Sequence, residues 1–300
     1  MLVVRMMSWT IWFPLFAAAL LVVTGCEENP VGGDEGISGA NRQITGTVRF
    51  DTNIEPANVY VWLDGFDLNT RTDRTGKFEL VLPPSAAQGR SGITGAFNLY
   101  YYMGNYTFAS TEVVTKDGEF VYDTEEISAD GQLREAVLLF QRLRIRTAVR
   151  PGSVSRSAIT VTGGKSDFVM AVDVTLQAAR NDTVIVFFPA TVESRTGPLL
   201  FRNTATDQVT VLNSIVAEQV TSALDTVTAA QKVRTMEINL FPDDLGVGEY
   251  EIIPYLLVDD VELPAGLRDE LGLDVLLPGA PYLKIPFVRD GDQRVFTVDE

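Results

Sequence analysis

The sequence predicts an all-β protein with two consecutive β-sandwich domains. From about residue 42 onward, apolar and polar residues alternate with a period of two. Gly, Asp, Asn and Pro interrupt this alternation at short intervals, as turns between short strands do. The 275 residues that follow position 25 (300 − 25) suit two domains of ordinary size. We therefore expect one sandwich over residues 42–142 and another over residues 143–300.

Residues 1–25 are typical of a secretory signal peptide. A single positive charge, Arg5, precedes an apolar run over residues 11–23. The run has the length of a signal-peptide hydrophobic region, about 7–15 residues, and is shorter than the ~20 residues that span a bilayer. Pro14 would also interrupt a long membrane helix.

The apolar run ends beside Cys26, the only cysteine in the chain. A single cysteine forms no internal disulfide, and its thiolate is a strong nucleophile. The run "VTGC" (residues 23–26) resembles the bacterial lipobox, in which an aliphatic residue and two small residues precede the cysteine. The resemblance implies that Cys26 receives a diacylglycerol, that the signal peptide is cut before it, and that the new amino terminus is acylated. The alternative is an ordinary secretory signal in which Cys26 stands by chance.

A lipidated Cys26 would anchor the protein in a membrane of the cell envelope, because three acyl chains exceed the two signals that stable anchoring needs. Glu27 stands where, in lipoproteins, an aspartate favours retention in the inner membrane. The resemblance therefore implies the outer membrane, on its periplasmic or its surface face. Residues 26–41 are polar and rich in glycine and acidic residues, and we expect them to form a flexible tether.

The first domain begins with three segments in which apolar residues alternate. Asp73 and Gly76 bracket a predicted tight turn before the third segment, and Pro83 and Pro84 end it. The residues predicted to face the core are Ile44, Gly46, Val48 and Phe50; Val59, Val61 and Leu63, with Tyr60 and Trp62 opposite; and Phe78, Leu80 and Leu82.

The segments "ITGTV", "NVYVWL" and "TDRTGKFELVLPP" together resemble the carboxypeptidase regulatory-like domain, a transthyretin-type sandwich. Thr72, Asp73, Gly76 and Phe78 stand at that family's hairpin positions. The likeness covers residues 42–83 and fades over residues 85–95. It implies a structural or adhesive domain without an active site. We interpret Asp73 as a turn former, with a calcium ligand as the alternative.

Residues 143–300 are predicted to form an immunoglobulin-like sandwich. Two strands flank a turn at residues 180–182, and two more flank residues 242–248. The run "GEYEI" resembles the segment before the last strands of immunoglobulin-like domains, with Tyr250 at a corner position. The order of segments also resembles, over fewer positions, the intracellular proteinase inhibitors. Residues 214–232 fit either helix or strand, and a short helix over residues 264–272 is expected to end at its glycine.

The composition excludes several classes of function. The chain has no histidine, the commonest general base and zinc ligand. If Cys26 carries lipid, no nucleophilic cysteine remains, and no glycine-rich phosphate loop is visible. The net charge of −16 becomes −17 once residues 1–25, with Arg5, are removed (−16 − 1), and this argues against nucleic acid. We therefore predict a protein that is not an enzyme and uses no cofactor or metal.

A row of arginines is the sharpest charge pattern in this acidic chain. In "RLRIRTAVR" (residues 142–150), alternation directs Leu143, Ile145, Thr147 and Val149 to one face and the arginines to the other. The row either binds an acidic partner or forms a solvated strand face whose guanidiniums pair with acids on neighbouring strands. Its members are Arg142, Arg144, Arg146 and Arg150.

An aromatic segment, "FNLYYYMGNYTF" (residues 97–108), is the second candidate for binding. Tyr100 and Tyr102 are expected on one face of a strand and Tyr101 on the other, before a turn at residues 103–105. Exposed rings would stack on sugars, whereas buried rings would fill the core, which we favour. The acidic pairs Asp243–Asp244 and Asp259–Asp260, with Glu262, lack the spacing of a calcium loop and are interpreted as solvated turns.

Together these patterns predict a lipid-anchored envelope protein that acts as a non-catalytic binding or scaffolding module, with an envelope protein or a polysaccharide as partner. Two alternatives remain open. One is a glycan-acting enzyme that uses two carboxylates in a groove. The other is a module that inhibits proteinases.

Overall fold

The computed structural model describes residues 41–89, 92–191, 199–212, 221–259, 263–273, 279–290 and 294–300. Residues 41–300 form one compact unit. The expected signal peptide, Cys26 and the tether up to residue 40 lie outside the described residues, so these predictions stay predictions. Within the described ranges, no helix combines the length and the apolar composition that a membrane span requires. Strands dominate the described residues, and the predicted all-β class is confirmed.

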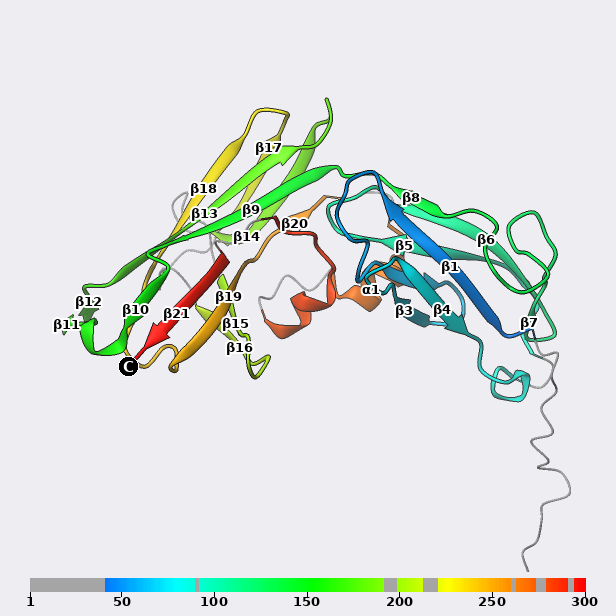
Figure 1. Ribbon diagram of the computed structural model, residues 1–300, viewed down its shortest axis with the longest axis horizontal. Helices are drawn as coiled ribbons and strands as arrows, with labels where there is room; N and C mark the ends of the chain where they lie inside the picture. The colour runs from blue at the N-terminus through cyan, green and yellow to red at the C-terminus, as the bar shows by residue number, and fades with distance from the viewer. Residues whose placement is uncertain are drawn as a thin grey trace, which may run out of the picture. The chain divides into compact units, whose positions relative to one another are not determined.

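The first half of the chain folds into two sheets that share a core (Figure 1). One sheet has the order β4-β1-β8, with β8 parallel to β1, and the other has the antiparallel order β3-β2-β5-β6-β7. The elements are β1 (Gln43–Phe50), β2 (Tyr60–Leu63), β3 (Leu68–Arg71), β4 (Lys77–Val81), the 3-10 turn η1 (Ser85–Ala87), β5 (Gly95–Tyr102), β6 (Ala109–Lys116), β7 (Glu119–Phe120) and β8 (Val137–Leu139).

The predicted inward residues of this half are buried. They include Ile44 and Val48 of β1, Val61 of β2 and Leu80 of β4. The predicted turn before β4 is also confirmed. The backbone N–H of Gly76 bonds to the carbonyl of Asp73 at 3.0 Å. Gly76 has φ +80°, and a Cβ at this position would lie 2.1 Å from the carbonyl oxygen of Val48, so only glycine fits.

The second half contains three further sheets and a two-stranded ribbon, β11-β12. The sheets have the orders β18-β13-β9, β17-β14-β20 and β10-β21-β19-β15-β16. Their elements are β9 (Leu143–Arg150), β10 (Ser153–Ser155), η2 (Arg156–Ala158), β11 (Val161–Thr162), β12 (Lys165–Ser166), β13 (Val169–Ala178), β14 (Val184–Thr191), β15 (Leu199–Asn203), β16 (Val209–Leu212), β17 (Thr221–Val227), β18 (Lys232–Asn239), β19 (Gly248–Pro254), β20 (Leu257–Val258), α1 (Ala265–Leu271), η3 (Ala280–Lys284) and β21 (Val295–Asp299).

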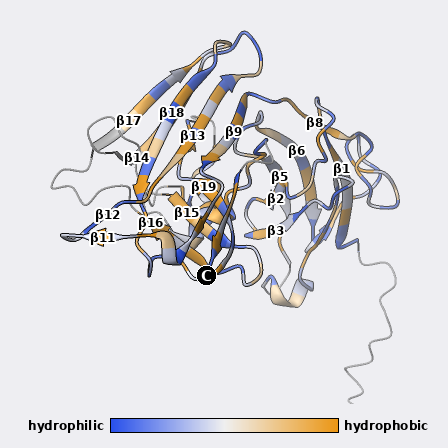
Figure 2. Cartoon of the chain, turned by 60° about the vertical axis from the view of Figure 1, so that its left-hand side comes forward, coloured by the Kyte–Doolittle hydropathy of each residue, from blue (hydrophilic) through white to orange (hydrophobic). Residues whose placement is uncertain are grey.

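Alternation of side chains builds the core of this half. Figure 2 shows hydrophobic and hydrophilic bands alternating along β13 and β18, and the inward residues of β13, such as Val172 and Val174, are fully buried. The turn at residues 180–182 joins β13 to β14, which belong to different sheets, so the chain crosses the core there instead of forming a hairpin. In the described part of the ambiguous stretch, residues 221–227 form strand β17, residues 228–231 connect it to β18, and Lys232 begins β18.

Two local features predicted from the sequence are present: the corner at Tyr250 and the helix end at Gly272. The hydroxyl of Tyr250 donates to the carbonyl of Gly246 at 2.9 Å, which is the bond of a tyrosine corner. Helix α1 ends at Gly272, which has the left-handed conformation (φ +66°) and donates its N–H to the carbonyl of Asp269 at 3.0 Å. A residue with a Cβ is strained in this conformation, so the helix ends at the expected glycine.

A buried ion pair connects two sheets of the second half. Asp225 of β17 is 1 % exposed and contacts Lys232 at 2.5 Å, while the guanidinium of Arg234 binds both of its carboxylate oxygens. Arg234 also lies over the ring of Phe188, 5.1 Å from its centroid. Burial raises the pKa of Asp225, but the two cations outweigh this and hold the pKa below its usual value.

A third hydrophobic cluster joins the two halves. It combines Tyr60, Trp62 and Tyr102 from β2 and β5 with Leu267 of α1 and Tyr282 of η3. A Cβ on Gly266 of α1 would lie 2.8 Å from Trp62, so helix and ring are in close contact. Both faces of β2 are therefore buried, which alternation alone does not predict.

Asn105 joins the halves through hydrogen bonds. It lies in the connection between β5 and β6, where the N–H of Tyr106 bonds to the carbonyl of Met103 at 2.8 Å and confirms the expected turn. The Asn105 side chain is fully buried and donates to the carbonyls of Leu143 (3.0 Å) and Val288 (2.8 Å). Its Oδ1 accepts the N–H of Val288 at 3.0 Å.

Candidate binding surface

Arg144, Arg146 and Arg150 lie on the outward face of β9, as predicted, whereas Arg142 precedes the strand. The burial of β9 alternates strictly between inward residues, such as Ile145 and Thr147, and outward ones, such as Arg144 and Arg146. Strand β13 pairs with β9 in antiparallel register and places Thr175 beside Arg146 and Gln177 beside Arg144. The outward face of the sheet at this end is therefore polar.

The two interpretations of the row apply to different arginines. Arg150 forms an ion pair with Asp173 on β13, and Asp173 also accepts the hydroxyl of Thr235 at 2.6 Å. This end of the row is a solvated strand face with cross-strand pairing. Arg144 and Arg146 differ, because no carboxylate among the described residues lies within 4.0 Å of either guanidinium. Arg142 is half-buried and has an interaction of its own.

Arg144 and Arg146 line a small open pocket with a cavity volume of about 220 Å³. The other walls are Thr175 and Gln177 of β13, Gln231 before β18, and Asp290. Asp290 is placed by a backbone hydrogen bond from its N–H to the carbonyl of Ile145 at 2.8 Å. The Nε of Arg144 donates to Oε1 of Gln141 at 3.4 Å, which leaves the rest of its guanidinium available to a ligand.

Sequence reasoning found the arginines of this pocket but missed its other members. The alternation of β13 shows that Thr175 and Gln177 point outward, yet it does not show that β13 lies beside β9. Asp290 is distant from Arg146 in the chain, and no local pattern connects the two. Only the folded arrangement brings these residues together.

The tyrosines of the aromatic segment (residues 97–108) pack inside the protein and stabilise the fold. Tyr101 is fully buried in the core of the first half, and burial raises the pKa of its hydroxyl. Tyr102 is 3 % exposed and belongs to the cluster that joins the halves. Tyr100 is half-buried and stacks between Trp62 and Phe108, with ring centroids 5.8 and 5.2 Å away. No face of Tyr101 or Tyr102 is left for a sugar ring.

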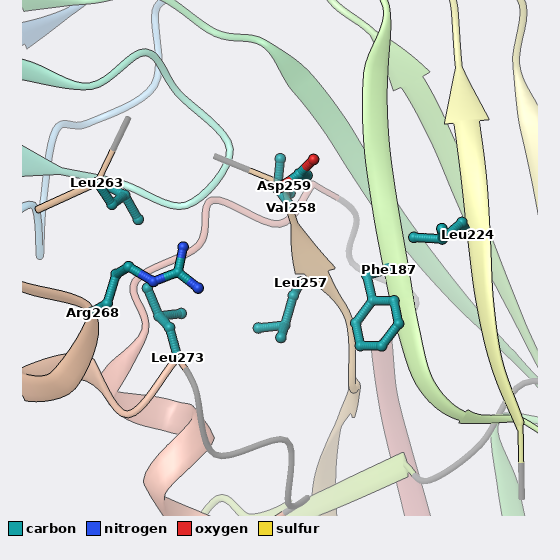
Figure 3. A pocket seen from close by; sticks show the side chains of 8 residues that line it. All are labelled: Phe187, Leu224, Leu257, Val258, Asp259, Leu263, Arg268 and Leu273. Carbon is teal, nitrogen blue, oxygen red and sulfur yellow. The ribbon is translucent and has the colours of Figure 1, made fainter. Parts of the chain in front are cut away.

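A second pocket, with a cavity volume of about 280 Å³, has mostly apolar walls (Figure 3). Phe187, Leu224 and Leu257 line one side, and Leu263 and Leu273 the other. Its charged members are Arg268, which has an interaction of its own, and the exposed Asp259. One cation and one anion on an apolar surface do not single out a ligand class.

Asp243 and Asp244 are each held by a contact with another residue. Asp244 accepts the N–H of Phe241 at 2.8 Å, and Asp243 contacts Arg156 at 3.3 Å. Asp260 and Glu262 lie outside the described residues. Across the described ranges, acidic and cysteine side chains do not gather in threes that could hold a metal ion.

Comparisons with known proteins do not identify a family. No protein-family profile matches the chain, and no curated protein matches its sequence. Among solved structures, the chain is similar at 17 % identity to a type II cohesin–X-dockerin complex from Acetivibrio cellulolyticus, with 42 % of this chain and 64 % of that one covered and a TM-score of 0.22.

Two further structures have the same low similarity, with 10 % identity and TM-scores of 0.23. The TIE protein of Bacillus anthracis is covered over 49 % of its length by 74 % of this chain, and BcpA, the major pilin subunit of Bacillus cereus, over 68 % by 72 % of this chain. TM-scores this low support no conclusion about function.

Proposed function

We propose that this protein is a non-catalytic binding module, held at the cell envelope by lipid on Cys26, which binds an acidic partner through Arg144 and Arg146. The observation that carries the proposal is the pocket on β9 and β13. Arg144 and Arg146 line it without a carboxylate within 4.0 Å of either guanidinium among the described residues, although the chain has 40 acidic residues. A guanidinium that forms no ion pair with the described residues is available to a partner's carboxylate, and its geometry suits that group.

The partner is an acidic polysaccharide or an acidic protein of the envelope. Either one would meet the pocket from solvent, because both arginines are exposed. The acidic remainder of the chain would repel the same partner elsewhere and so restrict it to this face.

The alternative of a glycan-acting enzyme requires two carboxylates in a groove. Asp73 and Glu79 line a pocket with a cavity volume of about 570 Å³. The carboxylate of Asp73 accepts the hydroxyl and N–H of Thr75 and the N–H of Lys77, which lowers its pKa. A general acid needs the opposite shift, and these three bonds support the interpretation of Asp73 as a turn former.

Charge reversal tests the binding site. Residues 41–300 and the double variant Arg144→Glu/Arg146→Glu are compared for binding to immobilised polyglutamate and polygalacturonate at two salt concentrations. We expect affinity to fall at least about tenfold, because hydrogen bonds to charged groups contribute about 1.5–3 kcal/mol each. Arg49→Glu, an exposed arginine on β1, is the matched control. Equal affinity of both proteins for every anionic ligand would contradict the proposed site.

Palmitate labelling in cells tests the anchor. Wild-type protein is expected to carry label and Cys26→Ser to carry none, because the thiol is the acylated group. An unlabelled wild type would contradict the lipid anchor without affecting the arginine site.

A further inference from the structure

We propose that the pocket on β9 and β13 binds a uronic-acid unit of an acidic polysaccharide, with the sugar's carboxylate on Arg144 and Arg146 and its hydroxyls on Gln177 and Asp290. This inference rests on the proposed function and chooses between the two partner classes that it leaves open. The choice follows from the hydrogen-bond acceptors of the pocket.

Gln177 supplies the first acceptor. Its Nε2 donates to the carbonyl of Ala229 at 2.8 Å. A carbonyl oxygen accepts only from the N–H end of the amide, so the orientation of this amide is fixed by chemistry. The Oε1 of Gln177 is thereby turned away from Ala229 and is free to accept a hydroxyl from a ligand.

Asp290 supplies the second acceptor. Its backbone bond to Ile145 keeps it beside Arg146, yet its carboxylate lies farther than 4.0 Å from both guanidiniums of the pocket. A carboxylate accepts hydroxyl hydrogens well and repels other carboxylates. Asp290 therefore disfavours a ligand that presents carboxylates alone, such as an acidic peptide, and favours one that also presents hydroxyls.

The size of the pocket limits the ligand to one ring at a time. Its cavity volume of about 220 Å³ is below the ~300 Å³ at which pockets for larger small molecules begin. Arg144 and Arg146 are two residues apart on one strand face, about 6.6–6.8 Å along β9, so they flank a single carboxylate. Thr175 adds a hydroxyl that donates or accepts.

The test measures binding of tri-galacturonate, its methyl ester and a short polyglutamate to residues 41–300, the compact unit with all three hydrophobic clusters. We expect the free acid to bind and its ester to bind at least tenfold more weakly. Arg144→Gln/Arg146→Gln should lose binding at least tenfold, and Gln177→Leu severalfold. Asp290→Asn should raise the affinity for polyglutamate more than the affinity for the sugar, because the sugar also loses a carboxylate that accepts its hydroxyls. Arg49→Gln and Gln208→Leu, both exposed residues outside the pocket, are matched controls with unchanged binding.

Three results would overturn the inference. Polyglutamate that binds through the arginines while tri-galacturonate does not would identify an acidic protein as the partner and leave the proposed function intact. Equal binding of acid and ester would remove the role of the carboxylate. Sugar binding that is unaffected by the arginine and Gln177 variants, with their folding checked by circular dichroism, would place the sugar elsewhere and would also contradict the proposed site.

Discussion

Replacing Asn105 with alanine is expected to destabilise the protein by about 4 kcal/mol, an unusually large effect for one polar residue. The fully buried side chain donates to the carbonyls of Leu143 and Val288 and accepts the N–H of Val288. Alanine leaves three backbone groups without this partner: the buried carbonyl of Leu143 and the half-buried carbonyl and N–H of Val288. A buried polar group that loses its partner costs about 1–3 kcal/mol and each half-buried one about 1 kcal/mol, so the three together give about 3–5 kcal/mol.

The assay is urea unfolding of residues 41–300, followed by far-ultraviolet circular dichroism and by the fluorescence of Trp62. Trp62 is the sole tryptophan of this segment and lies in the cluster that joins the two halves. We expect the midpoint of both transitions to fall. Fluorescence should change at lower urea than circular dichroism, because Asn105 connects the first half to β9 and to Val288 of the second.

The matched control is Asn239→Ala, an asparagine at the exposed end of β18. Its effect should stay within about 0.5 kcal/mol, as for most surface substitutions. The reasoning is refuted if Asn105→Ala lowers the unfolding free energy by less than about 1 kcal/mol, since the bonds would then contribute no more than exposed ones.

Five further substitutions test individual contacts, each measured by chemical unfolding. Thr147→Val should stabilise the protein by about 1 kcal/mol, because the buried hydroxyl of Thr147 has no hydrogen-bond partner among the described residues; a loss of stability would show that it has one. Asp225→Asn should cost about 1.5–3 kcal/mol at pH 7, because the partly exposed Arg234 and Lys232 lose their charged partner. Because the pKa of Asp225 is lower in the folded state than its unfolded value of about 3.9, the ionised carboxylate stabilises the fold above that pH, and this stabilisation is lost as pH falls through the folded pKa. The difference in unfolding free energy between wild type and Asp225→Asn should therefore shrink in acid. A difference that does not change with pH would contradict this sign. Gly272→Ala should cost about 1–2 kcal/mol through its left-handed backbone, and no cost would indicate that α1 ends differently. Tyr250→Phe should cost about 0.5–1.5 kcal/mol by removing the bond to Gly246, and Tyr282→Phe, which removes a hydroxyl with more partners, should cost more.

Features that depend on neighbouring residues were predictable from the sequence. The inward face of β1, the turn at Asp73 and Gly76, the helix end at Gly272 and the corner at Tyr250 all follow from side-chain period or local backbone chemistry. In each case the deciding interaction spans only a few residues, so the sequence pattern contains it.

Features that depend on the packing of distant segments were not predictable. The second face of β2 is buried by α1, some 200 residues later in the chain. The alternation within "NVYVWL" does not predict this burial. Asn105 reads locally as a turn residue, although its side chain bonds to Val288. The candidate site divides in the same way. Alternation placed Arg144 and Arg146 outward, whereas Gln177 and Asp290 enter the pocket through strand order.

The aromatic face of β2 and β5 has a consequence for how this architecture can change over evolution. Tyr60, Trp62 and Tyr102 are covered by α1 and η3 from the far end of the chain. A first half released from the second would present this patch to water, and patches of that kind drive association between molecules. The two sandwiches are therefore not interchangeable modules, and a recombination event that replaced one would have to supply a new cover for these rings.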